Sequence, residues 1–104
     1  MIYALNAPVI TNFGSYSFIR ISPEEAKALL SRNFVSAVGH KGTARLMSSL
    51  IGIEIPFNRV AVHMLPGDEA VVLWLIERPS EGHIYSAEEL SSIPCELGLL
   101  KRIS

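Results

Sequence analysis

The apolar stretch AVVLWLI, residues 70–76, decides how this chain folds. A strand with one face in water alternates apolar and polar side chains, whereas this stretch is apolar throughout. Such a strand is typical of the centre of a sheet that is covered on both faces. We therefore expect a central strand covered by a helix on one side and by a partner subunit on the other. Trp74 is expected in the core or in that dimer interface.

The segments on either side of this strand complete an α/β pattern. Residues 58–64 also have strand character, and a Pro-Gly turn follows them, so they predict a hairpin with residues 70–77. Periodicity predicts further strands at 1–5, 13–21, 34–38 and 97–103, and helices at 23–31, 41–51 and from residue 86. The predicted fold is one α/β domain, residues 1–104, with a mixed sheet of about five strands and helices packed mainly on one face.

The predicted helix at 23–31 has a clear start signal. Ser22 can cap its N-terminus, and Pro23 suits the first helical position because its fixed φ is helical. Glu25 stands three residues after the cap, the spacing of a capping box.

Composition limits the class of protein. The 104 residues are 49% hydrophobic and 18% charged, which predicts one folded core rather than a disordered chain. A single cysteine, Cys95, excludes an internal disulfide framework and a zinc site built from cysteines. No long apolar run and no basic leader are present, so we expect a soluble cytoplasmic protein that does not bind a membrane.

The charges are nearly balanced overall but unevenly placed. Lys plus Arg is 9 and Asp plus Glu is 10, which excludes a generally basic nucleic-acid coat. Residues 26–63, however, hold five basic residues and only one acidic residue, Glu54. Lys41 and Arg45 share the polar face of the predicted helix at 41–51. This region predicts a positive surface for an anionic ligand, and an ordinary distribution of surface charge is the alternative.

The segment VGHKGT, residues 38–43, is the strongest candidate for chemistry. A short strand runs through a glycine into a helix N-terminus, where free N–H groups and the helix dipole attract anions. Gly39 and Gly42 would let a phosphate approach the backbone, and the Thr43 hydroxyl could donate a further hydrogen bond. The spacing is not that of a P-loop. The alternative is a plain helix start with glycine in a tight turn.

Five short matches in chain order make this sequence resemble the viral ring-nuclease family. The family comprises small homodimeric anti-CRISPR proteins of archaeal viruses, with bacterial homologues, that degrade cyclic tetra-adenylate. The matches are Leu5-Asn6-Ala7, Gly39-His40 with Thr43, Leu46 with Ser49-Leu50, Asn58-Arg59-Val60, and Arg78 with Glu81-Gly82.

The resemblance implies a role for each matched residue. The family's catalytic histidine corresponds to His40, and its loop arginine and glutamate correspond to Arg78 and Glu81. The expected ligand-binding residues are Asn6, Thr11, Gly39, Lys41, Gly42, Thr43 and Arg59.

The sequence departs from the viral members at a few of these positions. Lys41-Gly42 stands where those members carry Asp-Ser. Val9 and Thr11 stand where they carry Ser and Asn, and Glu77 stands where they carry Gln.

A cyclic oligoadenylate brings its own nucleophile, the ribose 2′-hydroxyl beside each phosphodiester. The protein holds that hydroxyl in line with the phosphorus and protonates the departing 5′-oxygen. Histidine titrates near neutrality, so His40 suits the general acid. Arg78 would stabilise charge on the phosphoryl oxygens, and Glu81 would orient His40 or Arg78 or accept the 2′ proton. This chemistry needs no metal or cofactor, and His63 and His83 form no recognisable ligand set with His40.

The symmetry of the ligand fits a homodimer. A ring of four identical nucleotides contains a twofold axis, as a homodimer does. Two copies of His40 facing opposite phosphates would yield two linear di-adenylates with 2′,3′-cyclic phosphate ends. The resemblance thus implies a homodimeric ring nuclease that antagonises type III CRISPR signalling. The alternatives are a non-catalytic module that sequesters or senses the nucleotide and a small DNA-binding regulator. The net charge of −1 disfavours the regulator, so no duplex nucleic acid is expected as a partner.

Overall fold

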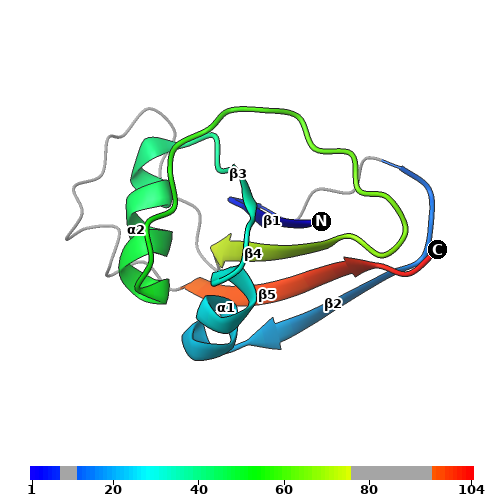
Figure 1. Ribbon diagram of the computed structural model, residues 1–104, viewed down its shortest axis with the longest axis horizontal. Coiled ribbons are helices and arrows are strands. Elements are labelled where there is room, and N and C mark those ends of the chain that lie inside the picture. The colour runs from blue at the N-terminus through cyan, green and yellow to red at the C-terminus, as the bar shows by residue number, and fades with distance from the viewer. Residues whose placement is uncertain (8–11, 76–94) are drawn as a thin grey trace.

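The structure, a computed structural model, describes residues 1–7, 12–75 and 95–104. Its described elements are β1 (Ile2–Leu5), β2 (Tyr16–Ile21), α1 (Pro23–Leu30), β3 (Val35–Ala37), α2 (Lys41–Ile51), β4 (Glu69–Leu75) and β5 (Cys95–Arg102) (Figure 1). The sequence predicts each of these elements to within a few residues of its observed ends. The helix predicted from residue 86 lies outside the described residues.

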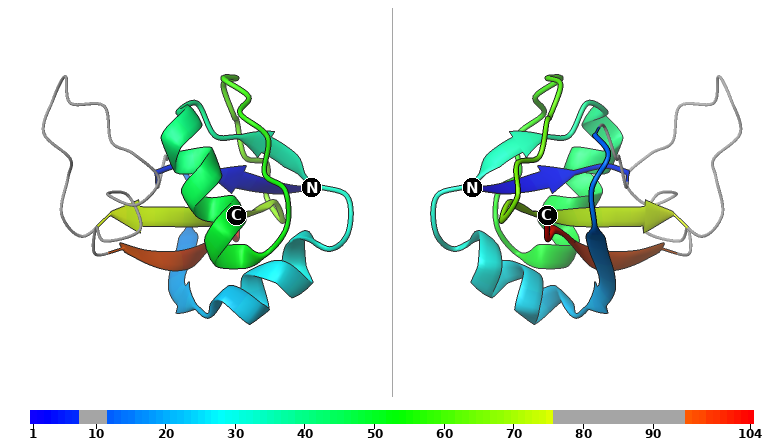
Figure 2. Two further views of the ribbon diagram at one scale, coloured as in Figure 1. Left: turned by 90° about the vertical axis from the view of Figure 1, so that its left-hand side faces the viewer. Right: turned by 90° about the vertical axis from the view of Figure 1, so that its right-hand side faces the viewer.

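The described strands form one mixed sheet in the order β2-β5-β4-β1-β3. β1 pairs in parallel with β3 and β4, whereas β5 runs antiparallel to β2 and β4. α1 and α2 pack on the same face, where their apolar residues share one cluster with β4 and β5 (Figure 2). The predicted α/β domain with a mixed five-stranded sheet and helices on one face is therefore confirmed.

β4 lies at the centre of the sheet, as its apolar sequence predicts. Val71 and Leu73 belong to the cluster under the helices, and Ala70 and Val72 belong to a second cluster on the other face. All four are 0% exposed. Burial on both faces explains why the stretch does not alternate.

The hairpin predicted from residues 58–64 is wrong. Residues 58–64 form no strand, and β4 pairs with β1 and β5 instead. Met64 is 2% exposed and joins the second cluster, against which Val62 also packs. The segment therefore lies across the second face of the sheet and covers Ala70 and Val72 without a partner subunit. Apolar side chains at every second position suit such a crossing as well as a paired strand.

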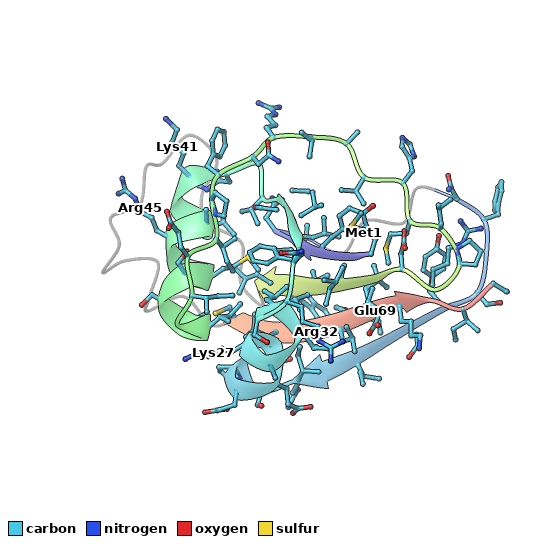
Figure 3. All side chains as sticks on the ribbon, viewed as in Figure 1. Met1, Lys27, Arg32, Lys41, Arg45 and Glu69 are labelled. Carbon is cyan, nitrogen blue, oxygen red and sulfur yellow. The ribbon has the colours of Figure 1, made fainter. Side chains whose placement is uncertain are left out.

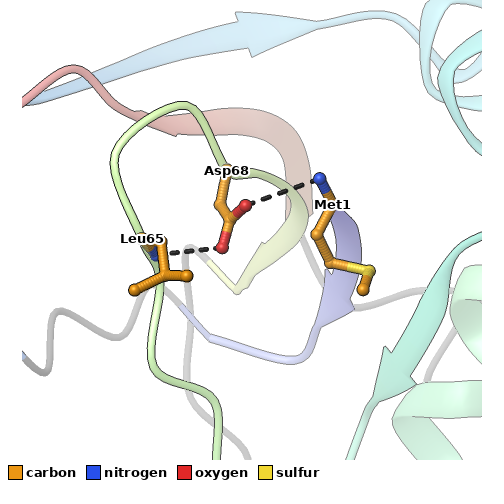
Figure 4. A network of polar contacts seen from close by, with 3 residues as sticks. All are labelled: Met1, Leu65 and Asp68. Carbon is orange, nitrogen blue, oxygen red and sulfur yellow. Dashed lines mark hydrogen bonds and ion pairs between the residues drawn. The ribbon is translucent and has the colours of Figure 1, made fainter.

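A tight turn brings this crossing segment into β4. Gly67 adopts a positive φ of 93°, a conformation that glycine adopts without strain. The Asp68 carboxylate accepts a hydrogen bond from the Leu65 peptide N–H at 2.9 Å and lies 3.4 Å from the α-amino group of Met1 (Figure 4). The turn thus ties the segment to the start of β1.

The predicted capping box of α1 is confirmed. The Glu25 N–H donates to Ser22 Oγ at 3.1 Å, and the Ser22 N–H donates to the Glu25 carboxylate at 3.2 Å. Pro23 occupies the first turn, as predicted. Two N–H groups that the helix leaves open are satisfied locally, which fixes where the helix begins.

Among the described residues, no helix is both long and apolar enough to cross a membrane.

Candidate functional site

The candidate site lies at the carboxyl edge of the sheet, where β1 and β3 end side by side. Because these neighbouring strands are parallel, with Leu5 opposite Ala37, the residues that follow them meet at one edge. The Asn6 side-chain oxygen accepts a hydrogen bond from the Gly39 peptide N–H at 3.4 Å. Two predicted site residues far apart in the sequence are thus in contact.

His40 is the N-cap of α2. Its backbone is extended, with φ −136° and ψ 121°, and its Nδ1 accepts a hydrogen bond from the Thr43 peptide N–H at 3.2 Å. The Thr43 hydroxyl lies 3.2 Å from the same Nδ1. A peptide N–H can only donate, so in this arrangement a neutral ring carries its hydrogen on Nε2. His40 is exposed, whereas Thr43 is buried.

The first turn of α2 has the features of an anion site. It contains no acidic residue that would compete with an anionic ligand. The imidazole takes the Thr43 N–H, which leaves the N–H groups of Lys41 and Gly42 for solvent or a ligand. These groups and the helix dipole favour negative charge at this end of α2.

Arg59 lies beside Gly39, which places a third predicted residue at the site. A Cβ atom on Gly39 would lie 3.2 Å from Arg59 Cγ, so the arginine stem packs on the glycine backbone. The neighbouring Asn58 fixes this position, because its N–H donates to Val38 O at 2.9 Å and its Nδ2 donates to Ser36 O at 2.7 Å.

Sequence reasoning missed the residues that hold this segment. Ser36 is 5% exposed, and its hydroxyl donates to Pro56 O at 2.6 Å. Phe57 forms a parallel bridge with Val38, and its ring lies 5.6 Å from the ammonium nitrogen of Lys41. Asn58 was part of a sequence match, but nothing in the chain pointed to Ser36 or Phe57.

The structure brings together Asn6, Gly39, His40, Lys41, Gly42, Thr43 and Arg59. Thr11, Arg78 and Glu81 lie outside the described residues, so their roles stay predictions. β4 also ends at this edge, because it runs parallel to β1 with Leu5 opposite Val72.

Comparison with known proteins places the chain in a family. The family model described as STIV B116-like matches residues 2–97. The uncharacterized protein ORF117 of Acidianus two-tailed virus is 33% identical over 110 aligned positions, covering 99% of this chain and 94% of that protein. YddF of Bacillus subtilis (strain 168) is 30% identical over 102 positions, covering 95% of this chain and 94% of that protein.

A solved structure has the same fold. B116 of Sulfolobus turreted icosahedral virus (STIV) superposes with a TM-score of 0.73 at 23% identity, covering 97% of this chain and 98% of that chain. Since the family match spans nearly the whole sequence and viral and bacterial relatives align along their lengths, the chain belongs to the STIV B116-like family.

Proposed function

We propose that this protein is a metal-independent ring nuclease. It would cleave cyclic tetra-adenylate into linear di-adenylates with 2′,3′-cyclic phosphate ends, and so antagonise type III CRISPR signalling in the cytoplasm. The observation that carries the proposal is the exposed imidazole of His40 at the N-terminus of α2, in one site with Asn6 and Arg59. The sequence resemblance to viral ring nucleases supplies the substrate.

The hydrogen bonding of His40 suggests how substrate prepares the acid. A phosphate bound at the start of α2 accepts hydrogen bonds from the same N–H groups that the imidazole now caps. The phosphate would therefore replace Nδ1 at the Thr43 N–H, which frees the ring to turn towards the departing 5′-oxygen. Thr43 Oγ1 lies 3.2 Å from Nδ1 and remains available as a hydrogen-bond partner for the released ring.

The reaction balances without a further reactant. The ribose 2′-oxygen loses its proton and bonds to phosphorus, and the bond from phosphorus to the 5′-oxygen breaks. The 5′-oxygen leaves with a proton from His40. The 2′ proton passes to Glu81 or, if Glu81 only orients its neighbours, to a solvent water, and Arg78 and Arg59 stabilise the charge on the phosphoryl oxygens.

We further propose that the active form is a homodimer. Its interface would be the part of the sheet around Trp74 and Phe18, on the face opposite the helices. Trp74 is 51% exposed and Phe18 is 38% exposed there, with ring centroids 5.9 Å apart. Trp74 lies near the C-terminal end of β4, the edge at which His40 also lies. A twofold axis near this aromatic pair would bring both copies of His40 to one cleft.

The decisive experiment compares wild type with His40→Asn on labelled cyclic tetra-adenylate in EDTA. Asparagine is a preferred N-cap residue, so α2 stays capped while the proton donor is lost. We expect wild type to release di-adenylates and His40→Asn to lose at least about 100-fold in rate with affinity kept within a few-fold. His63→Asn, at another exposed histidine, should cleave like wild type. Intact substrate with wild type, or full activity in His40→Asn, contradicts the proposal.

A second candidate function is a non-catalytic protein that binds and sequesters a cyclic oligonucleotide. One observation favours it: His40 Nδ1 already has a structural role as the helix cap. Under this reading wild type binds the ring without releasing product, and His40→Asn binds equally well.

A further inference from the structure

An open groove runs along the outer side of α2, beyond the site around His40. Its volume is about 420 Å³, within the range of about 300–1,000 Å³ for small-molecule sites. One wall comes from α2 with Lys41 and Arg45, and the other from residues 54–57 with Glu54 and Phe57. Lys41 and Arg45 both project from α2 away from the sheet (Figure 3).

Phe57 is an exposed aromatic ring on a fixed backbone. The Ser36 hydroxyl donates to Pro56 O at 2.6 Å, and the Asn58 N–H donates to Val38 O at 2.9 Å, so the backbone on both sides of Phe57 is tied to β3 and the residue after it. The ring is nevertheless 45% exposed. A solvent-facing ring on a fixed backbone loses little freedom when a flat group stacks on it.

Among the described residues, no acidic side chain pairs with the cations beside this ring, although Glu54 lines the opposite wall of the groove. Lys41 and Arg45 are four residues apart on one helix face, where like charges destabilise the helix. Within the described part of the chain, neither forms an ion pair, and the ammonium of Lys41 rests 5.6 Å from the centroid of the Phe57 ring. A bound phosphate would relieve the repulsion between these two cations.

We propose that this groove binds one nucleotide of a single-stranded oligonucleotide, with its base on Phe57 and its phosphate between Lys41 and Arg45. An aromatic platform next to cations is the arrangement by which proteins hold single strands, and it accepts any base. Lys41, which lines the groove, is the residue after His40, so the next nucleotide of a strand held at His40 would have this groove beside it. The choice of adenylate as ligand rests on the proposed function, whereas the stacking site does not.

The test measures polarisation of a fluorescent linear tetra-adenylate with the full chain in EDTA. Phe57→Leu keeps an apolar side chain but removes the ring, and we expect affinity to fall at least about fivefold. Arg45→Gln should weaken binding and make the slope of log affinity against log salt shallower by about one. The matched controls are Phe13→Leu, at a ring that is 101% exposed, and Arg32→Gln, at an exposed arginine beyond the end of α1. Both should bind like wild type.

Three results would contradict the proposal that the groove binds a nucleotide. They are unchanged affinity in Phe57→Leu, an equal loss in Arg32→Gln and Arg45→Gln, or displacement by an acidic peptide as effective as displacement by unlabelled tetra-adenylate. The last would mean that charge alone is recognised. Melting curves of each variant report whether it is folded, and Phe57→Tyr, which keeps a ring, should restore affinity if Phe57→Leu is unstable.

The same variants separate this inference from the proposed function. If wild type leaves the cyclic ring intact yet Phe57→Leu loses affinity for the linear strand, the nuclease proposal fails and the groove stands. If wild type cleaves the ring but Phe57→Leu and Arg45→Gln bind the linear strand normally, the groove proposal is wrong and the nuclease proposal is retained.

Discussion

The Nδ1 atom of His40 accepts the Thr43 peptide N–H, and this bond ties the ring to α2. A proton on Nδ1 would break the bond, because two donors cannot share one hydrogen bond. Capping of the helix and full protonation of the ring therefore exclude each other unless another acceptor takes over the N–H. Thr43 has the right atom on the other side, since its hydroxyl can accept from a protonated Nδ1. One residue pair thus serves both states of the ring.

Cys95 gives a prediction on pH. Burial raises the pKa of its thiol, because the thiolate loses hydration in the fold. In the unfolded chain this thiol ionises near pH 8.5, whereas in the folded chain it stays protonated to higher pH. The contribution of the thiol to the free energy of unfolding is therefore complete below about pH 8.5 and is lost as the pH rises above it. We expect the wild-type urea midpoint to drop more than that of Cys95→Ala between about pH 7 and about pH 9.5. Equal drops in the two proteins would show that the thiol is not the cause.

At the scale of elements, local signals were sufficient to predict the two helices that the structure describes, α1 and α2. Ser22 and Glu25 satisfy each other within one turn of α1, and the helical spacing of the apolar residues predicts α2. The hairpin failed because alternation in residues 58–64 does not distinguish a paired strand from a segment lying across a sheet. Only the burial of Met64 against the second cluster decides, and that is a property of the whole fold.

Only some residues of the candidate site could be predicted from the sequence. His40 and Thr43 could be predicted because they are three residues apart at a helix start, whereas Asn6 was predicted only from the resemblance to the viral ring nucleases. Ser36 could not, because its partner Pro56 is twenty positions away and an isolated serine gives no signal. The groove beside Phe57 depends on that long-range bond, so the sequence alone did not indicate it.

Ser22 and Asn58 should contribute similarly to the free energy of unfolding but differently to ligand binding. Ser22→Ala removes the cap of α1, and Asn58→Ala removes the bond to Ser36 O, so each should cost about 1 kcal/mol of unfolding free energy. Asn58 also positions Arg59 and Phe57, whereas Ser22 does not contact the site. We therefore expect only Asn58→Ala to weaken oligoadenylate binding. Equal affinities for the two variants, measured at matched stability, would mean that Asn58 is merely structural.

At the scale of the whole molecule, the two faces of the sheet are covered unequally. The helices cover one face, and the crossing segment covers the other around Ala70 and Val72. The crossing segment does not cover Phe18. The Phe18 ring packs directly on Gly98, where a Cβ atom would overlap with it. Arg20 and Glu96 form an ion pair of 2.7 Å at the border of this aromatic pair. A patch with an apolar centre and both charges at its rim can be complementary to a second copy of itself.

The exposed patch around Trp74 and Phe18 is predicted to be the dimer interface. A stable interface buries about 800 Å² per partner, so Trp74 and Phe18 would be its centre rather than its whole area. We expect wild type to sediment as a dimer and Trp74→Lys as a folded monomer, because a lysine there would bury an unpaired charge. Leu65→Lys, at an exposed leucine outside the patch, is the control and should remain dimeric. The monomer should also lose ring cleavage, because two copies of His40 no longer share a cleft. A dimeric Trp74→Lys, or a wild type that is monomeric at micromolar concentration, would place the interface elsewhere or remove it.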